Sequence, residues 1–319
     1  MSPEKVRWGI LGPGRIAAKL AGGAGRAPHA TLLAVASRDR DRAAEFAARF
    51  GMARVYDSYE ALLADPDVDA VYISLPNSLH HPMTMQAIAA GKHVLCEKPY
   101  TRHPDEVTEA FDAAEGRRLI LMEAYMWRHT PLVKRFLELL PEIGELQSIR
   151  STFSFRLDEP GDVRLNAKLD GGCLMDVGCY CVSGSRLVAG AEPSEVFGRQ
   201  TLAPSGVDHV FSGMLRFPSG VVAEILSGFT FHHRSLEAIG SSSTLLARDP
   251  WLLEDGGLWL GDREIAIDLR DPYGLEIENM SAAIIGDGKP LLGRADALAQ
   301  ARTIEALYRS ASSGSAVAI

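Results

Sequence analysis

The chain is poor in cysteine, and the few cysteines that it has show no regular spacing. None of the four belongs to a CxxC pair: Cys96, Cys173, Cys179 and Cys181. Even with the histidine pairs His80–His81 and His232–His233, they do not give the ligand spacing of a zinc site. We therefore predict reduced thiols in a cytosolic protein and no metal centre.

Long apolar runs and an excess of basic residues are also missing. No run reaches the roughly 18 apolar residues that a membrane-spanning helix needs. The N-terminal stretch MSPEKVRWGILGPG lacks the apolar segment of a secretory signal, so we expect a cytoplasmic protein. The net charge is −8 and the pI is about 5.6. Nucleic acid and anionic membranes are therefore not the expected partners.

The length of 319 residues suits two domains better than one core. In the first 125 residues, apolar runs without polar alternation, typical of strands buried on both faces, alternate with amphipathic stretches. Strand–helix–strand alternation predicts parallel strands, so residues 1–124 are predicted to form a doubly wound α/β (Rossmann) domain that binds a dinucleotide. The expected strands are 6–11, 31–36, 54–56, 70–75, 93–96 and 119–123; the expected helices are 15–24, 40–50, 59–64, 82–90 and 104–115.

The pattern changes after about Arg128. Helices are expected over residues 131–140 and 295–310, and the segments between them have strand character without intervening helices. Residues 125–319 are therefore predicted to form an α+β domain with a mainly antiparallel sheet. Its expected strands are 146–155, 196–202, 207–217, 221–231 and 258–269.

A glycine motif lies between the first expected strand and the first expected helix. In GILGPGRIA, Gly12, Gly14 and Ala17 give the pattern G-x-G-x-x-A. Gly12 permits a tight turn, Gly14 allows the backbone to approach a pyrophosphate, and Ala17 allows close helix packing. Because a helix N-terminus offers free N–H groups, the phosphates are placed on residues 12–17, which include Arg15 and Ile16. A plain strand-to-helix turn is the alternative.

The second expected strand indicates which dinucleotide binds. It ends in VASRDRDR, where an NAD site usually has Asp or Glu for the ribose 2′-hydroxyl. Ser37 and Arg38 occupy that place, and Arg42 is near. Guanidinium groups form strong, directional hydrogen bonds with phosphate, which favours NADP over NAD. Asp39 is interpreted as the cap of the next helix.

Charged residues end the strand in KHVLCEKPY. Ligands of open α/β sheets bind beyond the carboxyl ends of the strands, and Lys98 follows such an end. Pro99 disfavours helical backbone at Lys98, which restricts the direction of its side chain. The ammonium group there can stabilise negative charge on a substrate oxygen during hydride transfer. Glu97 is expected to pair with a neighbour or with a ribose hydroxyl.

A second strand end carries the motif LPNSLHH. Pro76, Asn77 and His80 follow the fourth expected strand, so we expect them near the nicotinamide end of the dinucleotide. Together, GxGxxA, PNSLH, EKP and the later GGCLMDVGCY resemble the glucose-fructose oxidoreductase/inositol dehydrogenase/rhizopine-catabolism (Gfo/Idh/MocA) family over essentially the whole chain. The resemblance implies a Rossmann domain and, in residues 125–319, a substrate-binding domain with an open-faced sheet that also forms a dimer interface. It also implies NAD(P)-dependent redox chemistry on sugars or related alcohols. By motif match, Lys98 takes the place of the family's catalytic lysine.

The second-domain motif differs from that of many family members, which have Asp and His four residues apart. Here the pair is Asp176 and Tyr180, and an i, i+4 spacing predicts that both lie on one helix face. The tyrosine resembles the branch of dimeric dihydrodiol dehydrogenases and NADP-dependent xylose dehydrogenases, which implies that Tyr180 is the acid/base. A phenol has a pKa of about 10, which a nearby ammonium group such as that of Lys98 would lower. Asp176 is expected to orient the substrate or the lysine.

The string EAYMWRHTP resembles the same branch, as does LEIENMSAAI. Trp127 is expected to shield the nicotinamide and Arg128 to bind its carboxamide or the substrate, with interdomain packing as the alternative. The predicted function is an NADP-dependent dehydrogenase of a sugar or polyol, such as D-xylose, D-glucose or a trans-dihydrodiol. A keto-sugar reductase, acting on a nucleotide-linked or anhydro-sugar, and a non-catalytic NADP sensor are the alternatives.

Overall fold

The computed structural model describes residues 5–319. The chain divides into two compact units, and each is described by itself. One unit contains the described residues up to His129 together with Asp271–Leu298; the other contains Thr130–Arg270 and Ala299–Ile319. The first unit therefore includes a later return of the chain, which a linear division into residues 1–124 and 125–319 leaves out.

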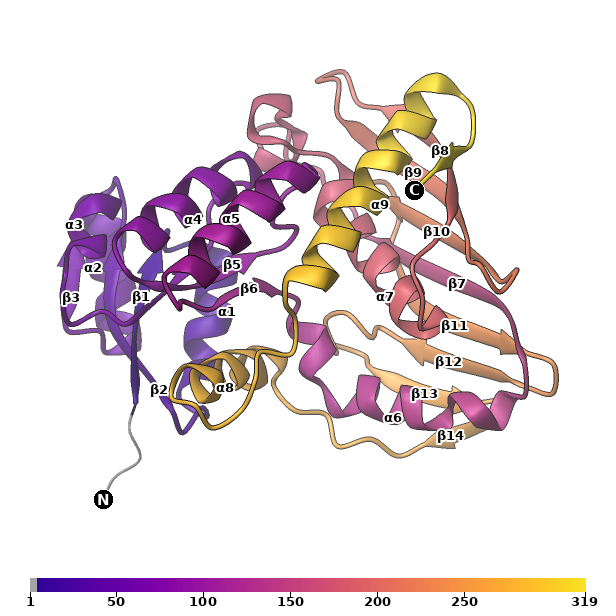
Figure 1. The fold of residues 1–319 in the computed structure, drawn as a ribbon, viewed down its shortest axis with the longest axis horizontal. Helices are drawn as coiled ribbons and strands as arrows, with labels where there is room; N and C mark the ends of the chain where they lie inside the picture. The colour runs from indigo at the N-terminus through magenta and orange to yellow at the C-terminus, as the bar shows by residue number, and fades with distance from the viewer. Residues whose placement is uncertain (1–4) are drawn as a thin grey trace. The chain divides into compact units, whose positions relative to one another are not determined.

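The first unit is built on a six-stranded parallel sheet in the order β3-β2-β1-β4-β5-β6, as Figure 1 shows in indigo and purple. The strand order reverses direction at β1, which is the topology of a doubly wound sheet. The α/β fold predicted for this part of the chain is confirmed. The strands are β1 (Val6–Leu11), β2 (Ala30–Ala36), β3 (Arg54–Tyr56), β4 (Ala70–Ile73), β5 (His93–Glu97) and β6 (Leu121–Ala124).

The helices of this unit lie where the amphipathic stretches predict them, with one addition. The predicted helices are α1 (Arg15–Ala24), α2 (Arg40–Phe50), α3 (Tyr59–Leu63), α4 (His80–Ala89) and α5 (Pro104–Gly116), with the short turns η1 (Asn77–Leu79) and η2 (Met126–His129). The addition is α8 (Pro272–Ile284), which packs against α1 and η2. Sequence patterning missed α8 because it is apolar on most sides, as a helix enclosed by its neighbours must be.

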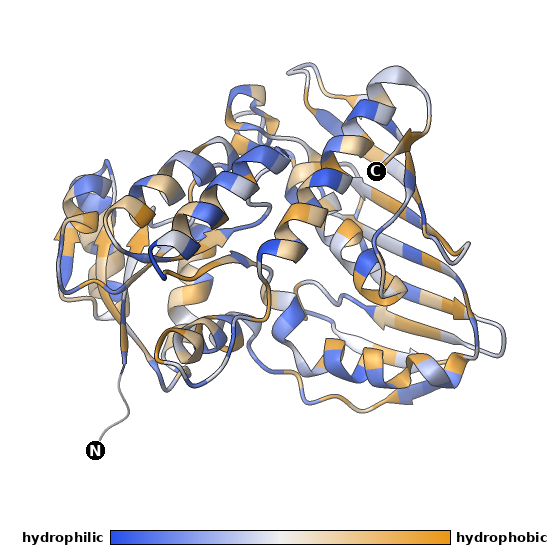
Figure 2. Ribbon diagram, in the orientation of Figure 1, coloured by the Kyte–Doolittle hydropathy of each residue, from blue (hydrophilic) through white to orange (hydrophobic). Residues whose placement is uncertain are grey.

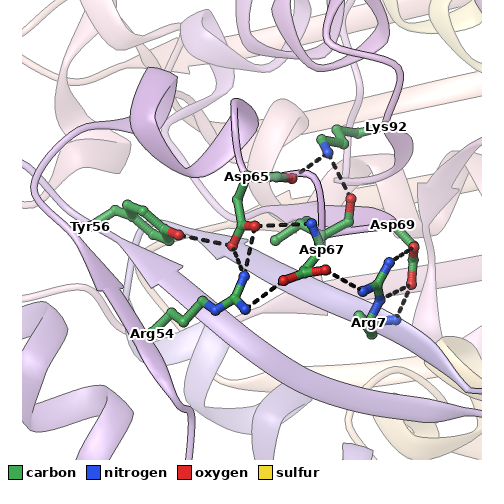
Figure 3. Close-up of polar contacts among 8 residues, drawn as sticks. Arg7, Arg54, Tyr56, Asp65, Asp67, Asp69 and Lys92 are labelled. Atoms are coloured by element: carbon green, nitrogen blue, oxygen red, sulfur yellow. Dashed lines mark hydrogen bonds and ion pairs between the residues drawn. The ribbon is translucent and has the colours of Figure 1, made fainter.

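Charged side chains form a network at the amino ends of the strands (Figure 3). Arg7, near the start of β1, donates to Asp69 at 2.8 and 2.9 Å and to Asp67 at 2.8 Å. Arg54, at the start of β3, donates to Asp65 at 2.7 Å and to Asp67 at 2.5 Å. This network holds the loop between α3 and β4 against two strands.

The second unit contains a nine-stranded sheet in the order β14-β13-β12-β11-β7-β10-β9-β8-β15. All its neighbouring strands are antiparallel except β10 and β7. The predicted mainly antiparallel domain is therefore confirmed. The strands are β7 (Leu146–Ser154), β8 (Glu195–Leu202), β9 (Asp208–Arg216), β10 (Val222–Gly228), β11 (His233–Gly240), β12 (Thr244–Arg248), β13 (Gly257–Leu260), β14 (Arg263–Ile265) and β15 (Val317–Ala318).

Two details of this sheet differ from the sequence expectation. The single strand predicted over residues 258–269 is wrong: the segment is a hairpin of β13 and β14, because Gly261 turns the chain with a φ of +56°. Strands β11 and β12 were not predicted. Their residues are only partly buried, so the apolar signal that marks a strand is weak there.

The helices of the second unit cover the sheet on one side. They are α6 (Pro131–Leu139), α7 (Cys179–Ala189) and the part of α9 (Arg294–Ser313) from Ala299 on. The short turns are η3 (Leu140–Ile143), η4 (Val163–Leu165), η5 (Ala167–Leu169) and the π-helical turn η6 (Leu174–Gly178). Hydrophobic and hydrophilic residues alternate along α6 (Figure 2), and its buried residues face β12 and β13. Among the described residues, no helix is long and apolar enough to cross a membrane.

Candidate active site

The glycine turn between β1 and α1 has the form that a phosphate site requires. Gly12 has a φ of +93°, and a Cβ atom there would lie 2.7 Å from a side-chain carbon of Leu75. A Cβ at Gly14 would meet nothing within 4 Å, so open space lies beside the first turn of α1. Ala17 is fully buried against the sheet. The site therefore fits a pyrophosphate on the N-terminus of α1.

Ser74 supports this turn from the neighbouring strand end. Its hydroxyl group donates to the carbonyl oxygen of Gly12 at 2.7 Å and lies 3.1 Å from that of Leu11. Sequence reasoning missed Ser74 because a single serine after a strand carries no motif.

The end of β2 places the residues predicted to select the cofactor. Asp39 caps α2, since its carboxylate accepts from the backbone N–H of Arg42 at 3.2 Å. Ser37 is buried, and its hydroxyl oxygen accepts from the N–H of Asp39 at 3.1 Å. Arg38 and Arg42 are exposed. Asp39 is thus engaged with backbone, and the two guanidinium groups face solvent, where a phosphate can reach them.

Lys98 follows β5 directly, at the same edge of the sheet as Gly12 and Ser37. Its backbone N–H donates to Glu97 Oε2 at 3.2 Å. The other carboxyl oxygen of Glu97 accepts a short hydrogen bond from the Tyr72 hydroxyl group. Glu97 therefore lies largely inside the unit, between β4 and the segment that carries Lys98.

His80 lies behind this edge. Its ring is buried, and the two nitrogens lie 2.9 Å from the carbonyl oxygens of Pro99 and Leu75. Burial lowers the pKa of His80 to about 4, although its two carbonyl neighbours favour the protonated ring. His80 thus joins the segment after β4, which includes Pro76 and Asn77, to the segment after Lys98. Its predicted cofactor contact, like those of Pro76 and Asn77, stays a prediction.

Trp127 and Arg128 belong to η2 of the same unit. Trp127 is fully buried, and Arg128 lies 3.5 Å from Asp296 and over the Trp127 ring. Both side chains thus contribute to packing within the unit. Their predicted contacts with nicotinamide or substrate are not tested by this arrangement.

Asp176 and Tyr180 are carried by the second unit, on two joined helical segments of different type. Asp176 lies in the π-helical turn η6, and Tyr180 lies in the first turn of α7. The regular i, i+4 helix expected from the sequence is interrupted, because the Cys179 N–H donates to the Leu174 carbonyl, five residues back.

The carboxylate of Asp176 is engaged by a guanidinium group. Arg164, from η4, donates through Nε to Asp176 Oδ2 at 2.7 Å and lies 3.1 Å from Asp162. The attraction to Asp176 raises the pKa of Arg164. This contact suits Asp176 for orienting a neighbouring group rather than for carrying a proton.

The ring of Tyr180 is held by two aromatic neighbours. Its centroid lies 5.2 Å from that of Phe153 on β7 and 5.9 Å from that of Trp251. Trp251 is itself fixed, because its indole N–H donates to the Thr152 carbonyl at 2.9 Å. A fixed ring gives the phenol oxygen one direction, which a proton carrier needs.

The four cysteines are buried, and none forms a disulfide among residues 5–319. Burial raises the pKa of Cys181 to about 12 and raises that of Cys173 as well. A raised pKa disfavours the thiolate form, so Cys173 and Cys181 are not suited to act as nucleophiles.

Two family models match the chain. The oxidoreductase family with an NAD-binding Rossmann fold matches residues 6–125, and the GFO/IDH/MocA C-terminal domain matches residues 141–246. The chain is also 38% identical to D-xylose 1-dehydrogenase (NADP(+)) 2 of Haloferax volcanii, over 98% of this chain and 99% of that protein. This chain belongs to the GFO/IDH/MocA oxidoreductase family.

Other family members are similar over different lengths. The chain is 36% identical to trans-1,2-dihydrobenzene-1,2-diol dehydrogenase of Mus musculus, over 68% of this chain and 66% of that protein. A 3-ketoreductase of Actinomadura kijaniata, solved in complex with NADP and TDP-benzene, has a TM-score of 0.91 and 29% identity, covering 96% of this chain and 98% of that one. The family and the oxidoreductase class predicted from the sequence are confirmed.

Proposed function

We propose that this chain is an NADP-dependent oxidoreductase that transfers a hydride between nicotinamide C4 and a carbon of a sugar or related polyol. The preferred reaction is oxidation of an aldose such as D-xylose or D-glucose at C1, which gives a lactone. The observation that carries the proposal is the 38% identity, over 98% of the chain, to an NADP-dependent D-xylose 1-dehydrogenase. A trans-dihydrodiol is the second candidate alcohol, because a dehydrogenase of that substrate is 36% identical.

The first unit offers the residues to hold the cofactor. The backbone of the turn from Gly12 to Ala17 would bind the pyrophosphate, and Ser37, Arg38 and Arg42 would bind the 2′-phosphate. The contribution of NADP, when bound, is to accept the hydride during oxidation. The further cofactor contacts that we propose are those of Arg15, Ile16, Pro76, Asn77, His80, Glu97, Lys98, Trp127 and Arg128.

The proton chemistry is assigned to three side chains. In oxidation, Tyr180 accepts the proton of the substrate hydroxyl group, and Lys98 stabilises the negative charge that develops on the same oxygen. Asp176 orients the substrate or the lysine, a role that its ion pair with Arg164 supports. In the reverse direction, Tyr180 returns the proton to the carbonyl oxygen.

A keto-sugar reductase, acting on a nucleotide-linked or anhydro-sugar, is the alternative. It is favoured by the likeness to the 3-ketoreductase of Actinomadura kijaniata. A non-catalytic NADP sensor is less favoured, because the chain retains Lys98, Asp176 and Tyr180 together, and a sensor needs no acid/base.

The division of labour follows the sequence prediction. Residues 1–124 are assigned to dinucleotide binding, and residues 125–319 to substrate binding and dimerisation, in a cytoplasmic protein. Side chains such as Met214, 49% exposed on β9, support a sheet face that associates with a second copy. Light scattering at micromolar concentration should give the mass of a dimer, and a monomer would contradict this part of the proposal.

The reaction is tested by NADP reduction with a panel of aldoses, polyols and dihydrodiols, and by NADPH oxidation with keto-sugars. Tyr180→Phe should lower kcat on the accepted substrate by about 100- to 10,000-fold, the usual contribution of a general acid–base group. NADP affinity should stay unchanged, because the ring and its packing remain. Lys98→Met should lower kcat at least as much.

The double variant Tyr180→Phe/Lys98→Met tests whether Tyr180 and Lys98 act on the same substrate oxygen or independently. If both side chains serve one oxygen, its kcat should be close to that of the worse single variant. If the kcat of Tyr180→Phe is within about threefold of the parental kcat, Tyr180 is not the acid/base and contributes only to packing.

A further inference from the structure

Asp208 is a buried carboxylate in the second unit that accepts three hydrogen bonds. It lies at the start of β9 and is 3% exposed. Its Oδ2 accepts from the backbone N–H of Leu174 at 2.6 Å and from the Cys173 thiol at 3.1 Å. Its Oδ1 accepts from the Tyr308 hydroxyl group on α9 at 2.9 Å. Three donors from two other segments thus fix one carboxylate.

The glycine before this contact leaves room for the carboxylate. Gly172 has a φ of +119°, and a Cβ atom there would lie 2.1 Å from Asp208 Oδ1. A side chain at this position would therefore displace the carboxylate. One glycine of the GGCLMD string is thus explained by the place of Asp208, a residue that no motif marks.

Leu174 connects Asp208 to the π-helical turn. Its N–H is held by Asp208, and its carbonyl oxygen accepts the hydrogen bond from Cys179 that defines the turn. A π turn is rare, and a regular α turn would use one residue fewer. Relaxation to a regular helix would therefore rotate the residues before the turn by about 100° relative to those after it.

This rotation would change the relative orientation of Asp176 and Tyr180, the two side chains of this unit to which we assign the chemistry. Asp176 lies inside the π turn, whereas Tyr180 follows it in α7. The direction of Asp176 relative to Tyr180 thus depends on whether the π turn persists. The Asp208 carboxyl group supplies an acceptor at the start of this turn, where a helix has no backbone acceptor for its first N–H groups.

We propose that Asp208 is a positioning residue for the reaction: it holds the start of the π turn at Leu174 and so fixes Asp176 relative to Tyr180. The inference rests on the proposed function for the roles of Asp176 and Tyr180. The link between Asp208 and the π turn stands on the hydrogen bonds alone.

The test compares Asp208→Ala with Asp208→Asn in the full chain. Asp208→Ala leaves the Leu174 N–H without its acceptor and should lower kcat at least tenfold, because small displacements of catalytic groups have effects of up to about 100-fold. NADP affinity should stay within about twofold of the parent. Asp208→Asn keeps an acceptor oxygen for Leu174 and should restore kcat to within about threefold.

Asp65→Ala is the matched control. It deletes another buried carboxylate, in the first unit, and should lower stability while kcat, measured well below Tm, stays within about twofold. If Asp208→Ala behaves like this control, Asp208 is only structural and the proposal is overturned. If Asp208→Ala does not fold, the double variant Asp208→Asn/Tyr308→Phe replaces it in the test. This variant lacks the Tyr308 hydroxyl group that orients the amide of Asn, so its kcat should fall at least threefold. A kcat equal to that of the parent would overturn the proposal.

Hydrogen exchange separates this proposal from the proposed function. Asp208→Ala, or the double variant, should speed amide exchange in residues 173–179 more than elsewhere in the second unit, whatever substrate the enzyme uses. Unchanged exchange there would overturn the role of Asp208 even if Tyr180 is confirmed as the acid/base. If exchange in residues 173–179 is faster but Tyr180→Phe does not lower kcat, the role of Asp208 in holding the π turn stands. Only the acid/base role proposed for Tyr180 is then refuted.

Discussion

At the amino ends of the parallel strands, every charged side chain labelled in Figure 3 has a polar partner. Near the carboxyl end of β5, in contrast, a fully buried carboxyl group has no hydrogen-bond partner among residues 5–319. At the amino ends, Lys92 donates to the carbonyl oxygens of Asp65 and Val68, both at 2.7 Å. The unpartnered group is that of Glu276 on α8. Burial, and then the charge of Glu97, raise its pKa well above the usual range.

The comparison indicates that the two ends of the parallel sheet have different roles. The paired charges at the amino ends hold a loop in place and leave no group available for a ligand. Near the carboxyl ends lie Lys98, the exposed Arg38 and Arg42, and the buried carboxyl group of Glu276 beside Glu97. A buried carboxyl group without a hydrogen-bond partner lowers stability, and proteins tolerate such groups at sites that bind or react.

The largest effect on stability is expected at the amino ends. Asp65→Ala removes the acceptor of Arg54 and Tyr56, whose hydroxyl group lies 2.8 Å from the carboxylate. Leaving these donors unpaired should lower the free energy of unfolding by about 2–3 kcal/mol, measured by urea unfolding. A loss below about 0.5 kcal/mol would show that this network does not hold the fold.

The same variant has a defined pH dependence. Burial raises the pKa of Asp65, but hydrogen bonds from Arg54, the Asp67 backbone and Tyr56 outweigh it and lower the pKa to about 2. A lowered pKa stabilises the folded chain above the unfolded value of about 3.9, and this contribution is lost as the pH falls through about 2. The difference between parent and Asp65→Ala should therefore shrink below about pH 4. A difference that stays constant down to the acid limit would contradict the ion-pair explanation.

The next effect is expected at the end of β2. Arg38→Ala should weaken NADP binding at least tenfold, because a hydrogen bond to a charged group contributes about 1.5–3 kcal/mol. NAD binding should be almost unchanged, since NAD has no 2′-phosphate. Titration of the chain with each cofactor by fluorescence or calorimetry gives both affinities. Equal losses for NADP and NAD would overturn the assignment of Arg38.

The last effect is expected at Glu276, and it is confined to higher pH. A raised pKa means that its stabilising contribution is complete below the unfolded value of about 4.3 and is lost as the pH rises toward the folded value. Glu276→Gln stays neutral in both states, so its Tm should equal that of the parent near pH 4 and exceed it by a margin that grows as the pH rises to 8. Glu278→Gln, on the same helix but paired with His29, is the control. A Tm difference between Glu276→Gln and the parent that does not grow with pH would show that Glu276 is ionised in the folded chain.

Much of the first unit could be predicted from local pattern. The bounds of β1, β3, α1 and α2 agree with the expected segments residue for residue, since apolar runs, caps such as Asp39 and turns such as Gly12 are local signals. Prediction was weaker where partners come from distant segments. Strands β11 and β12 have only two fully buried apolar residues each and gain partners from other strands of the sheet. Helix α8 returns to the first unit from more than 140 residues away.

The sequence by itself determined the Rossmann fold, the glycine turn, the position of Lys98 after β5 and the family, because each depends on residues close together in the chain. Tertiary structure decided the partners of the side chains to which we assign the chemistry. Arg164 on Asp176, Phe153 and Trp251 around Tyr180, and Asp208 beneath the π turn come from separate elements, and no spacing along the chain indicates them. The physical reason is that hydrogen bonds and aromatic contacts depend on distances that exist only once the sheet has brought those elements together.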